Sequence, residues 1–286
     1  MDEFALQSAA FAAQVEQELQ DGRISFPTVL ELSMRIKQLA DDPNSSLRDI
    51  ANVVRAEPVL SAKTLRMANT VQLNPYQAPI TAVNDAVLRV GLAALRCLAY
   101  AVAAEQLAKD HRSGRMRLVA SGLWLHSVDV ACWAYALAAE LKICNPDTAL
   151  LAGMMRTIGH FYLLAKAGEY PAVERNMDRF AEMVATWSEP VGQAILEVFE
   201  LPPSILDAFD DMEIYGDVWP PSDLGDILFI ASLAAETPNP FDTMLGNTHR
   251  PDLLQACTGG IDREQFDALL ASARTTRQAI LAAVCG

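Results

Sequence analysis

The chain has 286 residues, of which 51% are hydrophobic; 22 Lys and Arg stand against 36 Asp and Glu, giving a formal net charge of −14 at pH 7. This length and apolar content allow a sizeable core, and the acidic balance argues against binding duplex nucleic acid through its phosphates. The five cysteines include no CxxC pair, which favours free thiols in a reducing cytoplasm. Without a signal-peptide pattern or a long apolar run, we expect a cytoplasmic protein that has no membrane partner.

Apolar residues recur at helical spacing almost throughout, and strand-like alternation is scarce. In the first quarter of the chain this spacing predicts helices over residues 3–20, 28–42, 45–57 and 58–73. Pro58 falls in the first turn of the last of these, where its missing N–H costs nothing. We expect that helix to bury Leu60, Thr64, Met67 and Val71.

The rest of the chain continues the helical pattern. Gly91 divides one apolar pair of helices and can end the first in a left-handed turn. Beyond a basic connector at 109–117, further helices are expected at 119–141, 147–166, 171–184, 188–200, 203–211, up to 236, and at 262–284, with loops at 214–223 and 237–251. The predicted fold class is all-α, a multi-helix bundle of antiparallel neighbours.

Three stretches carry a family pattern. They read "FPTVLELSMRIKQLADDPNSSLRDIANVVRAEPVLSAKTLRMANTVQL", "ITAVNDAVLRVGLAALRCL", and "LWLHSVDVACWAYALAAEL" followed by "DTALLAGMMRTIGHFYLL". Together they resemble HDOD domains over about residues 24–236. The resemblance implies a helical, non-catalytic relative of HD-type phosphohydrolases, of a kind found in bacterial signalling proteins. It divides the chain into an N-terminal helix (1–23), an HDOD N-terminal half (24–110), a degenerate HD-like half (115–236), and a loop with a C-terminal helix (237–286).

The same resemblance places the metal ligands of an HD hydrolase at His126, Arg156, Thr157 and Ser232. Of the four expected ligands only His126 remains, and a guanidinium repels a metal cation. His160, four residues after Arg156, could be a displaced ligand, but a rebuilt site would need new ligands from several elements. We therefore expect no metal, no cofactor and no catalytic residue, with His126 packed in the core.

Other polar residues have a functional and a structural interpretation. The basic patch Lys109, His111, Arg112, Arg115 and Arg117 could bind a phosphate or an acidic partner, or it could be a solvated connector at a helix end. Arg156 could bind an anion in the old metal cleft, although a structural carboxylate would satisfy it equally. Trp219, which Pro220 and Pro221 follow, could be a docking anchor or could fold back over the core.

The function expected from this pattern is that of a non-enzymatic regulatory protein that binds other signalling proteins through helical surfaces. Arg66 and Asn69 match family positions that would organise the junction of the two halves, or simply hold helices together. The alternative is a sensor that binds a nucleotide or cyclic dinucleotide, with Arg156 and His126 contacting phosphate. Residual phosphohydrolase activity is a third, formal alternative. The sequence names neither the partner nor the oligomeric state.

Overall fold

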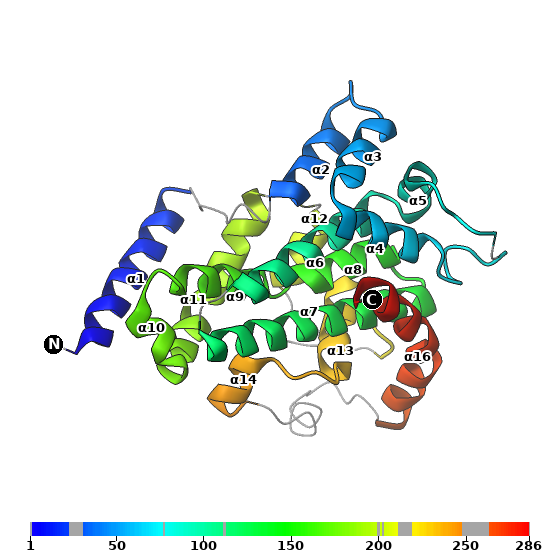
Figure 1. Cartoon of the computed structure of the whole chain (residues 1–286). Helices are drawn as coiled ribbons and strands as arrows, with labels where there is room; N and C mark the ends of the chain where they lie inside the picture. Colours follow the sequence, from blue (N-terminus) through cyan, green and yellow to red (C-terminus); the bar gives the residue numbers. More distant parts are fainter. Residues whose placement is uncertain are drawn as a thin grey trace.

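The computed structural model describes residues 2–22, 31–76, 78–110, 113–198, 201, 203–210, 219–247 and 263–285. Within them every regular element is a helix, which confirms the predicted fold class (Figure 1). No single described helix is long and apolar enough to cross a membrane; only the pair Val83–Val90 and Leu92–Gln106, which meet at 109°, reaches that length and hydropathy together.

The helices follow one another in this order: α1 (Glu3–Gln20), α2 (Glu31–Asp41), α3 (Leu47–Ala56), α4 (Pro58–Ala68), α5 (Val83–Val90), α6 (Leu92–Asp110), α7 (Gly114–Leu141), α8 (Pro146–Met155), α9 (Ile158–Ala167), α10 (Pro171–Arg175), α11 (Met177–Val198), α12 (Pro203–Asp210), α13 (Leu224–Ala234), α14 (Pro240–Leu245) and α16 (Arg263–Cys285). Most predicted helices are present within a few residues of the expected bounds.

Helix α7 runs through the middle of the molecule and packs against α6, α8, α13 and α16 (Figure 1). Every residue from Ser127 to Ala138 is buried, because this stretch, Asp129 apart, is mostly apolar or small on all its faces. A Cβ built on Gly153 of α8 would lie 2.7 Å from the Cα of Ala131. The glycine therefore lets α7 and α8 pack backbone to backbone.

The first and last described helices, α1 and α16, both pack against the rest of the bundle. Phe11 of α1 packs edge-on against Tyr170 and Phe180, with ring centroids 5.5 and 5.9 Å away. Helix α16 packs against α7 and α4. There the buried ammonium of Lys63 donates a hydrogen bond to the carbonyl of Val284 and lies 3.6 Å from a carboxylate oxygen of Glu105.

Three boundary predictions in the second half of the chain are wrong. The expected helix 147–166 is two helices, α8 and α9, divided at Arg156 and Thr157. Helix α11 continues through Pro190, and the break falls earlier, at Asn176. The expected loop 237–251 contains α14, which Asn239 caps by accepting a hydrogen bond from the N–H of Phe241.

The basic connector is also shorter than expected. Ser113 caps α7, so α7 begins five residues before the predicted position 119. In the N-terminal half α4 ends at Ala68, which leaves the side chain of Val71 61% exposed, whereas Leu60, Thr64 and Met67 are buried as predicted. Gly91 has the expected positive φ, 80°, but with ψ at 164° it is not a left-handed helical turn.

Candidate functional site

A cleft of about 480 Å³ opens among α7, α9, α11, α13 and α14. Its walls include all four residues at the expected ligand positions and the candidate displaced ligand: His126, Arg156, Thr157, Ser232 and His160. Residues that lie up to about a hundred positions apart in the chain thus meet in one place. Ser188, Asn239, Asp242 and Asn247 complete the polar lining.

Thr157, which the family resemblance aligns with the aspartate of the His-Asp pair in an HD enzyme, has a hydroxyl that is already hydrogen-bonded. It is buried and hydrogen-bonded to the hydroxyl of Ser127, which in turn donates to the carbonyl of Leu123 over 2.8 Å. Thr157 is also the N-cap of α9, so it marks the break between α8 and α9. This position ties α9 to α7.

His126 is held by a backbone carbonyl. Its Nδ1 lies 2.8 Å from the carbonyl oxygen of Thr237. Because a carbonyl only accepts, Nδ1 carries the proton and Nε2 of the neutral ring keeps its lone pair. Burial lowers the pKa of His126, the Thr237 carbonyl opposes that effect, and the charge of Arg156 adds to it. The ring is therefore neutral at pH 7 and offers one acceptor.

Arg156 is the cation of the cleft. Within the described part of the chain its guanidinium makes one hydrogen bond, from Nη1 to the carbonyl oxygen of Leu228 at 3.4 Å, which is long for such a bond. Burial lowers the pKa of Arg156, and the nearby carboxylate of Asp242 opposes this. Burial raises the pKa of Asp242, while Arg156 lowers it. The two charges influence one another without a close ion pair.

His160 forms the wall beside Arg156. Its ring lies 5.6 Å from that of Phe241. Burial, and then the neighbouring His126 and Arg156, lower the pKa of His160 to about 3. The side chain is thus neutral under ordinary conditions.

Gly159 fixes how closely this wall approaches α11. A Cβ at Gly159 would lie 1.9 Å from the carbonyl oxygen of Ser188, which no side chain can tolerate without moving the backbone. The glycine therefore sets the spacing between α9 and α11, the two helices that carry His160 and Ser188.

The lining does not fit the divalent metal of an HD hydrolase. Among the described residues no three His, Cys, Asp or Glu side chains are placed to hold a metal ion. His126 keeps the hydrogen bond to a carbonyl that is typical of a metal-bound histidine, but the guanidinium of Arg156 shares the cleft with it. Arg156 and His126 can instead receive an anion that carries a hydrogen-bond donor.

A second cavity of about 260 Å³ adjoins the first and shares Arg156, His160 and Ser188 with it. Its remaining walls are mostly apolar, from Met155, Ile158, Leu196 and Phe209, with Glu189 and Gln193 also in the lining. The sequence pattern did not indicate this side lobe.

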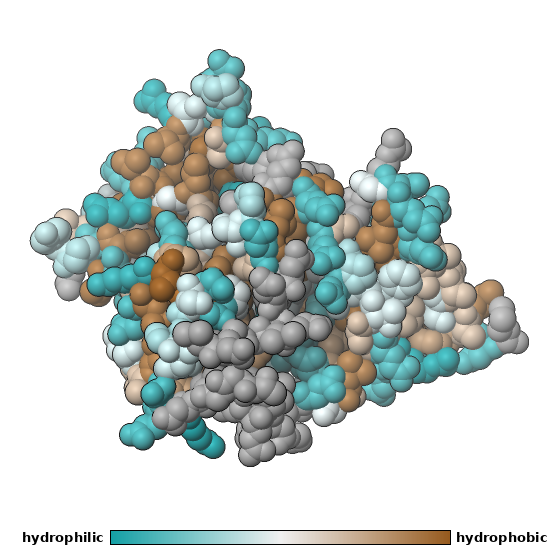
Figure 2. Space-filling model, turned by 180° about the vertical axis from the view of Figure 1, so that it is seen from behind, coloured by the Kyte–Doolittle hydropathy of each residue, from teal (hydrophilic) through white to brown (hydrophobic). Residues whose placement is uncertain are grey.

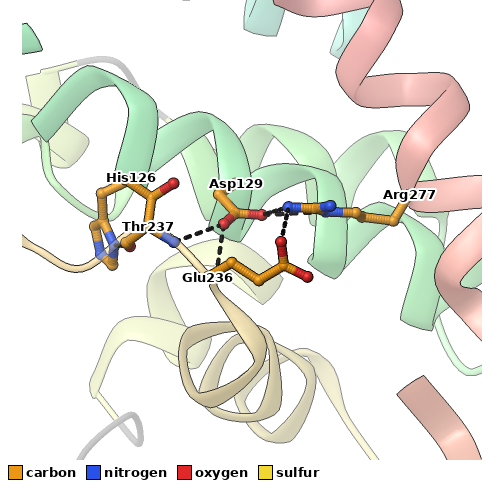
Figure 3. A network of polar contacts seen from close by, with 5 residues as sticks. All are labelled: His126, Asp129, Glu236, Thr237 and Arg277. Atoms are coloured by element: carbon orange, nitrogen blue, oxygen red, sulfur yellow. Dashed lines mark hydrogen bonds and ion pairs between the residues drawn. The ribbon is translucent and has the colours of Figure 1, made fainter. Parts of the chain in front are cut away.

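One turn along α7 from His126 lies a second polar cluster, which the sequence analysis missed. The carboxylate of Asp129 is buried; Oδ1 accepts from Nε and Nη2 of Arg277 at 3.2 and 2.5 Å, and Oδ2 accepts from the N–H groups of Glu236 and Thr237 at 2.7 and 3.0 Å. Figure 3 shows Asp129 between Arg277 of α16 and the segment of Glu236 and Thr237. The carbonyl of Thr237 also contacts His126. An aspartate inside an apolar helix, in "HSVDV", was the available signal.

The other candidate residues lie away from the cleft. In the basic patch, Arg115 pairs with Asp178 at 2.7 Å and Arg117 is exposed; Lys109 lies in α6, and His111 and Arg112 lie outside the described residues. The patch is therefore not a connector at one helix end, since Arg115 and Arg117 belong to the first turn of α7.

Trp219, Asn69 and Arg66 have distinct surroundings. Trp219 is partly buried and packs against the core. The side chain of Asn69 bonds to the backbone of Leu65 and Ile80, and so fixes the segment after α4. Arg66 is exposed. Asn69 thus has a structural role within the N-terminal half. Trp219, Asn69 and Arg66 all lie outside the cleft lining.

Comparisons with known proteins agree with this architecture. The HDOD domain model matches residues 26–213. A candidate metal-dependent phosphohydrolase from Shewanella amazonensis SB2B superposes with a TM-score of 0.66 at 23% identity, over 96% of this chain and 99% of that one. An HDOD domain protein of unknown function from Geobacter sulfurreducens gives 0.56 at 23% identity, over 95% and 96%.

A candidate signal transduction protein from Marinobacter aquaeolei VT8 has a TM-score of 0.54 at 19% identity, over 100% of this chain and 67% of that one. No curated protein matches the sequence. At these identities the solved structures establish the shared fold, while the family model covers well over half of the chain. The chain therefore belongs to the HDOD domain family.

Proposed function

We propose that this chain is a non-enzymatic regulatory protein of bacterial signal transduction that acts by binding other signalling proteins. The observation that carries the proposal is the cleft chemistry: a guanidinium and an engaged hydroxyl occupy the positions at which an HD hydrolase holds its metal. A core without that donor set can still serve as a rigid scaffold, because fold and function are separable. The likeness of its fold to a candidate signal transduction protein supports this role.

Exposed apolar side chains on the N-terminal half indicate where a partner would bind. Five large ones lie on or between α3, α4 and α5, namely Leu47, Val59, Val71, Tyr76 and Leu88, with 47–92% of each exposed. Seen from behind, hydrophobic surface gathers over this end of the molecule (Figure 2). We call this set the α3–α5 surface. Apolar groups gathered on one face commonly mark a protein-binding site.

Photo-crosslinking in cells tests this role. A photoreactive phenylalanine derivative would replace Tyr76 or Leu88 in the α3–α5 surface and, as a control, Leu118 on α7, which is 76% exposed. We expect one shared adduct with a signalling protein from both α3–α5 positions and not from Leu118. Adducts that are the same at all three positions, or absent at both α3–α5 positions, would contradict the proposal.

A second candidate function, that of an anion sensor, is favoured by one specific observation. Arg156 lines an open cleft, and its guanidinium makes one long hydrogen bond of 3.4 Å to the described part of the chain; the carboxylate of Asp242 is near without forming a close pair. A half-buried arginine gains from a phosphate or carboxylate that binds in a bidentate way. Calorimetry with a panel of nucleotides and cyclic dinucleotides tests the sensor, and a complete absence of heat would rule it out.

A further inference from the structure

The two cavities and their charges narrow the chemistry of a ligand for this site. Arg156 lies in the lining of both cavities, as do His160 and Ser188. A molecule that occupies both the cleft and the side lobe would therefore lie against these three residues, with Arg156 as the cation among them. Its charged group would bind at this shared point, and its remaining part would extend into one of the two volumes.

The charges allow for one anionic group. Among the described residues that line the cavities, Arg156 is the single permanent cation, and His160 and His126 are both held neutral. Each cavity also has one carboxylate, Asp242 in the cleft and Glu189 in the side lobe. A second phosphate placed in either volume would approach a like charge without a second arginine.

The two volumes differ in polarity. The side lobe is walled by Met155, Ile158, Leu196 and Phe209, of which the first three are buried and the phenylalanine is half-buried. A flat ring system can pack against such walls, and stacking on an aromatic face adds to the burial of its area. The cleft, by contrast, is lined by hydroxyl, amide and imidazole groups.

The tautomer of His126 adds one requirement. Because Nδ1–H is committed to the carbonyl of Thr237, Nε2 can only accept a hydrogen bond. A ligand that satisfies both Arg156 and His126 therefore carries an acidic group together with a hydroxyl or another donor. A phosphate monoester attached to a hydroxyl-bearing sugar meets this requirement.

With the sensor function as its premise, we propose that the site binds a small molecule with one phosphate joined to a flat ring system, of the class of nucleoside 5′-monophosphates. The phosphate lies at Arg156 and the ring lies in the lobe formed by Met155, Ile158, Leu196 and Phe209. A cyclic dinucleotide, with two phosphates and two bases, does not match the one cation and one apolar lobe.

Isothermal titration of the full chain tests this with five probes: adenosine 5′-monophosphate, guanosine 5′-monophosphate, adenosine, inorganic phosphate and cyclic di-adenosine monophosphate. We expect at least one monophosphate to bind, with adenosine and inorganic phosphate each about tenfold or more weaker, because each lacks one of the two contacts. Phenyl phosphate, which keeps one phosphate and a flat ring but lacks the hydroxyl-bearing sugar, serves as an additional arm. Binding equal to that of the nucleotide would support the single-phosphate, ring-bearing class and would overturn the requirement for a sugar hydroxyl at His126.

Two variants with the same loss of charge locate the binding. Arg156→Gln should weaken the monophosphate by about tenfold or more, whereas Arg117→Gln, at an exposed arginine outside both cavities, should leave it unchanged. Phe209→Ala should weaken the monophosphate but not inorganic phosphate. Equal effects of the two arginine variants would overturn the proposed position.

The outcomes separate this proposal from its premise. If the cyclic dinucleotide binds more tightly than every monophosphate and depends on Arg156, the ligand class is wrong and the sensor function stands. If no phosphate compound binds, both the ligand class and the sensor function fall, and the protein-binding role is unaffected.

Discussion

His126 and Asp129 lie one turn apart on α7, and each belongs to a polar cluster. The two clusters differ in how completely their charges are hydrogen-bonded. Asp129 accepts four hydrogen bonds, two from Arg277 and two from backbone N–H groups, and is buried. Arg156, which faces the cleft beside His126, makes one long hydrogen bond, to a carbonyl, among the residues that the structure describes. A complete set of partners is what a structural ion pair requires, since a buried charge without them is costly.

The contrast assigns different roles to the two clusters. The Asp129 cluster connects helix α16 to α7 and fixes the backbone of residues 236 and 237. The carbonyl of Thr237 in turn orients His126. The cleft cluster has spare hydrogen-bonding capacity and an opening to solvent. The first cluster therefore supports the fold and the shape of the cleft wall, and the second is the one at which we propose that a ligand binds.

The largest expected effect follows from breaking the satisfied cluster. Asp129→Ala removes the carboxylate closest to the buried Arg277, with that of Glu236 3.8 Å away, and leaves two N–H groups without their acceptor. We expect the free energy of unfolding to fall by about 3–5 kcal/mol, measured by urea denaturation. Combining it with Arg277→Met should recover part of the loss, because the unpaired charge is then removed. Additive losses would mean that the pair is not coupled.

The close approach of α9 and α11 predicts the next effect. Gly159→Ala places a methyl group against the carbonyl of Ser188 and should cost about 1–3 kcal/mol, or more if the helices cannot separate. Gly114→Ala, where a Cβ meets nothing within 4 Å, is the matched control and should be neutral or slightly stabilising. Equal stability of the two variants would show that the cleft wall is not held by this contact.

His160 predicts how stability depends on pH. Its folded pKa, about 3, lies below the ordinary value of 6.5, so the unfolded chain binds the proton first as the pH falls. The stability associated with neutral His160 is present above pH 6.5 and is lost as the pH falls from there towards 3. Relative to His160→Leu, the wild type should lose up to about 1.4 kcal/mol per pH unit in this window. Parallel stability curves for the two proteins would contradict the assignment.

The same kind of substitution, arginine to methionine, can be made in each cluster, and we expect it to have little effect on stability at Arg156. Arg277→Met should be strongly destabilising, whereas Arg156→Met should change the free energy of unfolding by less than about 1 kcal/mol, since it removes one long hydrogen bond. The pKa of His160 should rise in Arg156→Met because the repelling charge is gone, which NMR titration would detect. Equal destabilisation by the two variants would erase the distinction between the clusters.

The sequence predicted the all-α fold and, through the family resemblance, the positions that converge on the cleft. The residues reach the cleft because of the order in which the helices pack, and the motifs on which the resemblance rests mark those helices. The break at Thr157 was not predictable from periodicity, because it depends on a hydroxyl contact with Ser127 on another helix. Nor was the α14 helix, whose six residues are too few for a periodic signal.

The partners of buried charges were also beyond the sequence. Asp129 could have been singled out as a carboxylate within an apolar helix, but nothing near Arg277 in the chain indicates that the two would meet across 148 positions. The side lobe depends in the same way on Phe209 from α12 lying beside α8 and α9. Long-range packing decides these contacts, and one-dimensional patterns do not encode it.

We propose that an arginine-containing binding site occupies the place of a metal centre in this cleft. Mass-spectrometric metal analysis of protein purified after growth with manganese, iron and zinc, alongside His126→Ala, distinguishes the two. We expect far less than one metal ion per chain, with no difference between the two proteins. Near-stoichiometric metal that is lost in His126→Ala would contradict it and would point to a rebuilt phosphohydrolase site.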